Sequence, residues 1–164
     1  MALAAPGLRK TLRETLRGRN PSSLGGMPLQ NEKYVIGLCD EALGVVSAKH
    51  HTFPWLLGDS SPTTGRQRAL PVDAYWESLD LVVEFHEKQH SEAVGLFDRR
   101  QTLSGVNRGL QRKLYDDRRV KLIPQHGLAL VIIPMADFVV RRNLIVPNRD
   151  ADLAAVRKYV GAFA

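Results

Sequence analysis

Three segments of the chain carry apolar residues at the three-to-four-residue spacing of an amphipathic helix. The first follows Asn31, a residue type that caps helices, and the second ends before Pro124 and Gly127, which do not continue a helix. The apolar stripes of the three segments are Val35, Leu38, Ala42, Val45 and Val46; Val106, Leu110 and Leu114, continued by Arg118; and Leu153, Val156, Tyr159 and Val160. We therefore expect helices near residues 31–48, 104–122 and 150–162.

Two short runs rich in β-branched and aromatic residues, PVDAYW and LDLVVEFH, are separated by a tight polar turn, which is typical of a β-hairpin. A turn from Glu77 to Asp80 pairs Trp76 with Leu81. The later run LALVIIP is continuous and apolar, as expected of a buried strand. The pattern predicts an α/β fold in which a central mixed β-sheet, made of the hairpin and this further strand, is flanked by helices.

The chain of 164 residues fits one domain, because two independent cores would each be too small. Its first part combines basic residues with the breaker-rich segment NPSSLGGMP. We expect a flexible basic arm over residues 1–30 and a single domain over residues 31–164. The arm also resembles an organellar transit peptide. No apolar run approaches the ~20 residues of a membrane helix. The single cysteine, Cys39, is expected in the core, so we predict a protein of the reducing cytoplasm.

The net charge of +6 favours an anionic partner. The excess is concentrated between Arg99 and Lys121, where eight cations stand against Asp116 and Asp117. Arginine side chains bind phosphate oxygens with two parallel hydrogen bonds, so this segment predicts nucleic-acid binding. A solvated helix face is the alternative. The candidate nucleic-acid-binding residues are Arg108, Gln111, Arg112, Arg118 and Arg119.

Continuing the hairpin register places Asp73 opposite Glu84, and strand alternation places His86 on the same face. Opposed like charges are destabilising unless they are exposed, paired with a cation or bound to a metal. Exposure on a solvated face is the simpler explanation, but the apolar neighbours of Glu84 predict that this strand is buried. Two carboxylates suit Mg²⁺ or Mn²⁺, which share their ligand shell with phosphate. The pattern favours a metal site for phosphodiester chemistry.

The segment PVD followed eleven residues later by VVEFH resembles the PD-(D/E)xK motif of restriction-endonuclease-like nucleases. The subsequent HEKQH resembles the branch that contains very-short-patch repair endonucleases, and the resemblance covers roughly residues 68–133. It implies a restriction-endonuclease-like fold, metal ligation by Asp73 and Glu84, and activation of water by His86 or His90. An additional acid on an N-terminal helix would be Glu41. His86 stands where the motif has its lysine, so the general base is not identified.

The same stretch contains His86, Glu87 and His90 in the order HExxH, which on a helix binds Zn²⁺ in metallopeptidases. Lys88 and Gln89 between the histidines, and the strand-like LDLVVEF before them, argue against that reading. We therefore expect a metal-dependent endonuclease acting on nucleic acid, with DNA as the expected substrate. A non-catalytic nucleic-acid-binding domain and a zinc metallopeptidase remain the alternatives.

Overall fold

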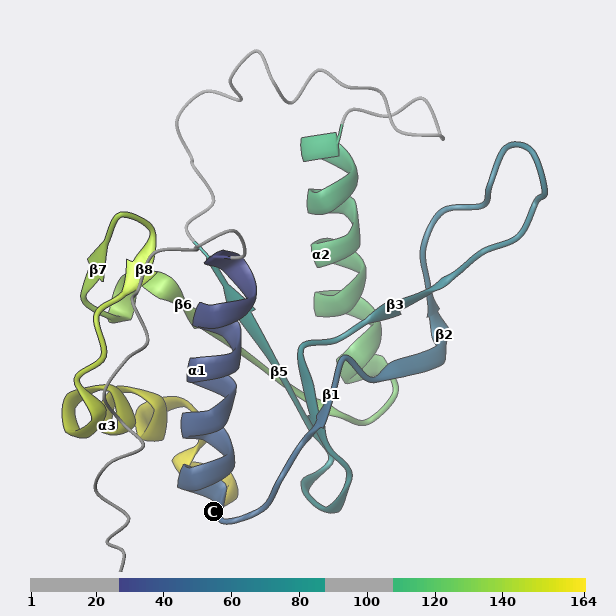
Figure 1. Cartoon of the computed structure of the whole chain (residues 1–164). Coiled ribbons are helices and arrows are strands. Elements are labelled where there is room, and N and C mark those ends of the chain that lie inside the picture. The colour runs from purple at the N-terminus through teal and green to yellow at the C-terminus, as the bar shows by residue number, and fades with distance from the viewer. Residues whose placement is uncertain (1–26, 88–107) are drawn as a thin grey trace, which may run out of the picture.

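A computed structural model of the chain describes residues 27–87 and 108–164 (Figure 1). A mixed sheet forms the middle layer, α1 and α3 cover one of its faces, and α2 covers the other. The expected α/β class with a mixed sheet between helices is therefore confirmed. The helices are α1 (Met27–Leu43), α2 (Arg108–Gln125) and α3 (Arg149–Val160). The strands are β1 (Ala48–Lys49), β2 (Thr52–Leu57), β3 (Ala69–Pro71), β4 (Ala74–Trp76), β5 (Leu81–His86), β6 (Ala129–Pro134), β7 (Val140–Arg141) and β8 (Leu144–Ile145).

The main sheet has the strand order β1-β4-β5-β6. β4 and β5 are antiparallel, with Trp76 opposite Leu81, so the hairpin register predicted from the sequence is confirmed. The turn between them is a short 3-10 helix, Glu77–Leu79, closed by Asp80 in the left-handed conformation. β6 pairs with β5 in parallel, as expected when a helix connects two strands.

The alternation of side chains along β5 divides the core into two parts. Leu81, Val83 and Phe85 pack with α1 and α3 on one face. Val82 packs on the other face with Ile123 of α2 and with residues of β2 and β3. Glu84 and His86 alternate with Phe85 and therefore share the face of Val82, toward α2. Cys39 is a buried free cysteine of the first part, as predicted.

The helix boundaries differ from the sequence prediction at several points. α1 begins within the predicted arm and ends at Leu43, because Gly44 takes a positive φ of 68° that terminates the helix. Val45 and Val46, predicted on the buried stripe, therefore lie beyond the helix and are exposed. Leu110 and Leu114 of α2 are also exposed, because the helix turns other residues toward the sheet. None of the helices in residues 27–87 and 108–164 is long and apolar enough to cross a membrane.

The strand predicted over PVDAYW is two strands, β3 and β4, with Asp73 between them. Pro71 ends β3 because it has no N–H to donate, and the chain passes there from its partner β2 to its partner β5. β2 carries Trp55 among residues for which the sequence gave no assignment. The segment MADFVVRRN, whose pattern was ambiguous, forms a 3-10 turn and β7, and the adjoining β8 completes a small second hairpin.

Candidate active site at the end of β5

Two buried carboxylates, those of Asp73 and Glu84, meet where β4 begins and β5 approaches its end. The confirmed register, Ala74 opposite Val83, continues to place Asp73 opposite Glu84. Asp73 Oδ2 accepts a hydrogen bond of 2.7 Å from the backbone N–H of Phe85. The backbone N–H of Asp73 in turn donates to the Glu84 carboxylate. These reciprocal bonds fix the two acids side by side in the folded chain.

Arg119 of α2 supplies the cation nearest to this pair. Its Nε lies 3.3 Å from Glu84 Oε1, and its two terminal nitrogens donate to Asp116 and to the carbonyl of Pro71. The Nε and Oε1 atoms are close enough for an ion pair, but within the described residues neither makes a hydrogen bond. We take the ion pair as real and its orientation as poor. Glu84 therefore keeps one buried oxygen without a hydrogen-bond donor.

The electrostatics of the pair follow from burial. Burial, together with the neighbouring Asp73 charge, raises the pKa of Glu84 to about 8, although Arg119 opposes the shift. Burial also raises the pKa of Asp73, against the lowering effects of its hydrogen bond from Phe85 and of nearby Arg119. Two carboxylates at this spacing resist simultaneous ionisation unless a stronger cation compensates them.

A third acid, Glu32 on α1, faces the pair. Burial and the charges of Asp73 and Glu87 raise its pKa, while His50, whose Nε2 is 3.7 Å from Glu32 Oε1, lowers it. The sequence analysis chose Glu41 as the helical acid instead. Glu41 lies nine residues later, roughly 13 Å along the helix axis, and pairs with Arg149 at 2.6 Å. The structure does not bring Glu41 to Asp73 and Glu84; the signal for Glu32 was its place in the helix turn nearest the end of β5, which only tertiary packing reveals.

The predicted histidine ligands divide between described and undescribed residues. His86 ends β5 on the face of Glu84, and its charge acts on Asp73. His90 lies outside the described residues. The zinc-peptidase reading requires a helix over residues 83–92, and the strand Leu81–His86 contradicts it over the part that is described. Within residues 27–87 and 108–164, no group of three or more histidine, cysteine or acidic side chains has the geometry of a preformed metal cage.

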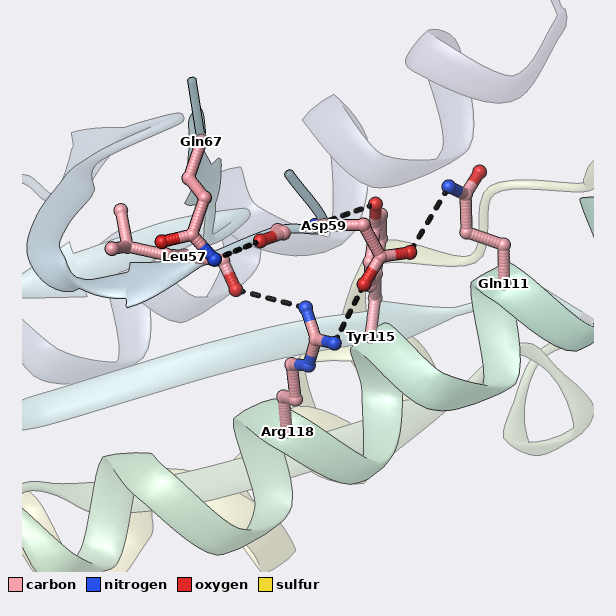
Figure 2. A network of polar contacts seen from close by, with 7 residues as sticks. Leu57, Asp59, Gln67, Gln111, Tyr115 and Arg118 are labelled. Atoms are coloured by element: carbon pink, nitrogen blue, oxygen red, sulfur yellow. Dashed lines mark hydrogen bonds and ion pairs between the residues drawn. The ribbon is translucent and has the colours of Figure 1, made fainter. Parts of the chain in front are cut away.

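The predicted basic residues of α2 occupy three different settings. Arg118 and Gln111 bind Asp59, which follows β2, and Figure 2 shows this network. Arg119 lies against Glu84, as described above. Arg112 is exposed. The side chain of Arg108 lies outside the described part of the chain, as do Arg99 and Arg100.

Comparison of the chain with protein-family models, with curated proteins and with solved structures returned no match. The assignment of a function to this site therefore depends on the geometry and chemistry of its own residues.

Proposed function

We propose that this protein is a divalent-metal-dependent nuclease whose active site is the Asp73–Glu84 pair. One observation carries the proposal: a buried glutamate with an oxygen that lacks a hydrogen-bond donor lies beside a second buried carboxylate at the end of a strand. Buried charges are costly unless they are paired or bind metal. The orientation of Arg119 satisfies this requirement only in part, and a divalent cation between the two carboxylates would satisfy it fully.

The donor set fits Mg²⁺ or Mn²⁺. Mg²⁺ is held in many enzymes by one or two carboxylates, with waters and substrate phosphate in the remaining positions, so a complete protein cage is not needed. Asp73 and Glu84 would hold the ion from adjacent strands, and Glu32 stands near enough to accept a hydrogen bond from one of its waters. When bound, the metal supplies charge neutralisation of the phosphate and acidification of a coordinated water.

The remaining side chains have roles in the proposal that follow from their positions. His86, on the same strand face as Glu84, would accept or orient the proton of the attacking water, in the place where the resembled motif has lysine. Arg119, which is fixed by Asp116 and Pro71, would keep Glu84 oriented while its own charge faces the phosphate. The DNA substrate stays an expectation from the basic charge and from the resemblance.

Replacement of each carboxylate tests the proposal. The Asp73→Asn and Glu84→Gln variants keep the shape of the site but remove one metal ligand each. Because a catalytic metal supplies several kcal/mol of transition-state stabilisation, we expect Mg²⁺- or Mn²⁺-dependent cleavage of plasmid DNA, or of RNA, to fall about 100-fold or more in either variant. The wild-type protein at pH 8 should also gain thermal stability on addition of Mg²⁺, and neither variant should gain as much.

The Glu41→Gln variant is the matched control, because it also replaces one helix carboxylate by its amide but alters only the exposed pair with Arg149. It should cleave as the wild type does. Full activity of both Asp73→Asn and Glu84→Gln would refute the proposal. Nucleic-acid binding by a wild-type protein that cleaves nothing with either metal would favour the non-catalytic binding domain instead.

A further inference from the structure

A polar β-hairpin projects from the molecule beside α2 (Figure 1). It consists of the ends of β2 and β3 and the loop between them, residues 57–69, which we call the arm. Backbone hydrogen bonds continue past the two strands, from Gly58 N–H to Arg68 O at 2.8 Å and from Ser61 N–H to Arg66 O at 2.9 Å. The arm is therefore a defined hairpin with a tightly turned tip, since Gly65 donates back to Ser61 at 2.8 Å.

Side chains of three successive turns of α2 hold the base of the arm, as Figure 2 shows. Arg118 donates to Asp59 Oδ1 at 2.6 Å and to the carbonyl of Leu57 at 3.1 Å. Gln111 donates to Asp59 Oδ2 at 3.3 Å, and the Tyr115 hydroxyl accepts from the Asp59 N–H at 3.2 Å. The hydrogen bond from Arg118 is the main cause of a lowered pKa of Asp59, so this carboxylate stays ionised at neutral pH.

The helix that holds the arm also holds the candidate active site. A Cβ on Gly58 would meet the Tyr115 hydroxyl at 3.2 Å, so the arm and the helix are in direct contact there. Arg118 binds the arm, while the next residue, Arg119, binds Glu84 and the carbonyl of Pro71. The position of the arm relative to the two carboxylates is thereby fixed within one turn of α2.

The outer part of the arm carries two cations, Arg66 and Arg68, whose side chains are exposed. Among the residues that the structure describes, neither guanidinium has an ion-pair partner. Arg112 is also exposed and lies on the helix stripe of Asp116 and Arg119, one and two turns before them. A protein gains little stability from holding unpaired cations on a rigid projection, whereas an anionic polymer gains binding sites at a set distance from the active site.

We infer that the arm is a nucleic-acid-binding element that grips the backbone of a duplex on one side of the cleaved phosphodiester, through Arg66 and Arg68. The inference rests on the proposed nuclease function and adds the way in which the substrate is held. Arg68 is five residues from Asp73, and an extended chain of that length spans at most roughly 18 Å. Since a duplex rises 3.4 Å per base pair, the phosphates that the arm contacts lie within about five base pairs of the active site.

The test compares two double substitutions that remove the same charge. Arg66→Ala with Arg68→Ala changes the arm, and Arg157→Ala with Lys158→Ala changes two exposed cations of α3, on the other side of the sheet. Binding of a fluorescent DNA duplex is measured by anisotropy without divalent cations over a range of salt concentrations. We expect the arm variant to bind on the order of tenfold more weakly at low salt, with the salt slope reduced by about 1.8, because each lost phosphate contact removes about 0.9.

The α3 variant should bind as the wild type does. The variant with lysine at both positions, Arg66→Lys with Arg68→Lys, should recover the salt slope, and this recovery excludes a folding defect as the cause of the loss. Equal binding by the arm and α3 variants would overturn the inference while leaving cleavage, and hence the proposed function, intact. A wild-type protein that binds no duplex, single-stranded DNA or RNA would overturn the proposed function itself, and the arm inference with it. A loss confined to single strands would also overturn the assignment to a duplex.

Discussion

At the scale of single residues, Glu84 is the most informative position in the chain. Hydrophobic neighbours on both sides in the sequence place it in a buried strand, and the fold then sets Asp73 beside it. A glutamine at this position would keep the packing and remove the electrostatic cost. The retention of a carboxylate in such surroundings is therefore the main physical reason to look for a cation here.

The raised pKa of Glu84 makes the metal-free protein less stable as the pH rises. The unfolded chain releases the Glu84 proton near its ordinary pKa of 4.5, whereas the folded protein holds it to about pH 8. Between these values the folded state binds more protons, so the free energy of unfolding falls with increasing pH. One pKa unit corresponds to about 1.4 kcal/mol, so the decrease is on the order of a few kcal/mol. Urea unfolding in EDTA at pH 5 and pH 8 measures it.

The Glu84→Gln variant provides the comparison for this pH dependence. It should be more stable than the wild type at pH 8 and should show a flatter profile between pH 5 and pH 8. Parallel profiles for the two proteins would mean that the Glu84 carboxyl is not the group responsible.

At the scale of elements, short hairpins carry the conformational detail that periodicity does not predict. The β7–β8 hairpin has a two-residue turn in which Arg142 and Asn143 both have positive φ, 51° and 63°. Hairpin turns of this kind favour Asn followed by Gly, because other side chains are strained in the left-handed region. Arg142 is the more unfavourable of the two, since asparagine enters this region more readily.

Replacing the turn by the favoured pair, Arg142→Asn with Asn143→Gly, should therefore raise the free energy of unfolding by about 1 kcal/mol. Thermal and urea unfolding measure the change. The control is Gly44→Ala, at a glycine with a φ of 68°, which places an ordinary side chain in the same unfavourable region and should destabilise the protein. An engineered turn that lowers the stability would show that Arg142 makes a compensating contact.

At the scale of the whole molecule, Asn31 joins three elements that are far apart in the sequence. Its side chain donates to Glu87 just after β5 at 3.2 Å and to the carbonyl of Asn143 at 2.9 Å, and it accepts from the N–H of Ile145 at 3.0 Å. Only 3% of this residue is exposed. The sequence pattern predicted it as a helix cap, but α1 begins earlier, and the amide instead fixes the β7–β8 hairpin beside the end of β5.

Removal of this amide should loosen the whole assembly. Asn31→Ala leaves a buried carbonyl and a buried N–H without partners, each at a cost of about 1–3 kcal/mol, so we expect a loss of roughly 2–4 kcal/mol in unfolding free energy. The Asn148→Ala variant, which removes only the cap of α3, should cost about 1 kcal/mol. If the two variants lose equal stability, the three bonds of Asn31 do not contribute as the structure indicates.

The sequence alone determined the features that depend on local periodicity and on pairing across a tight turn. The three helices, the register of Trp76 with Leu81, the burial of Glu84 and its position opposite Asp73 follow from the spacing of apolar residues and from the two-residue repeat of a strand. Helix ends were predicted less well, since Gly44 and not the apolar stripe decides where α1 stops.

Tertiary structure alone decided which distant side chains reach the two carboxylates. Glu32 was chosen over Glu41 by the side and end of α1 that face β5, and Arg119 was separated from Arg118 by a rotation of about 100° per residue around α2, which turns one guanidinium toward Glu84 and the other toward Asp59. Sequence spacing specifies which residues share a helix face, but not the direction in which that face points. That direction is set by the packing of each helix on the sheet, through contacts between residues that lie far apart along the chain.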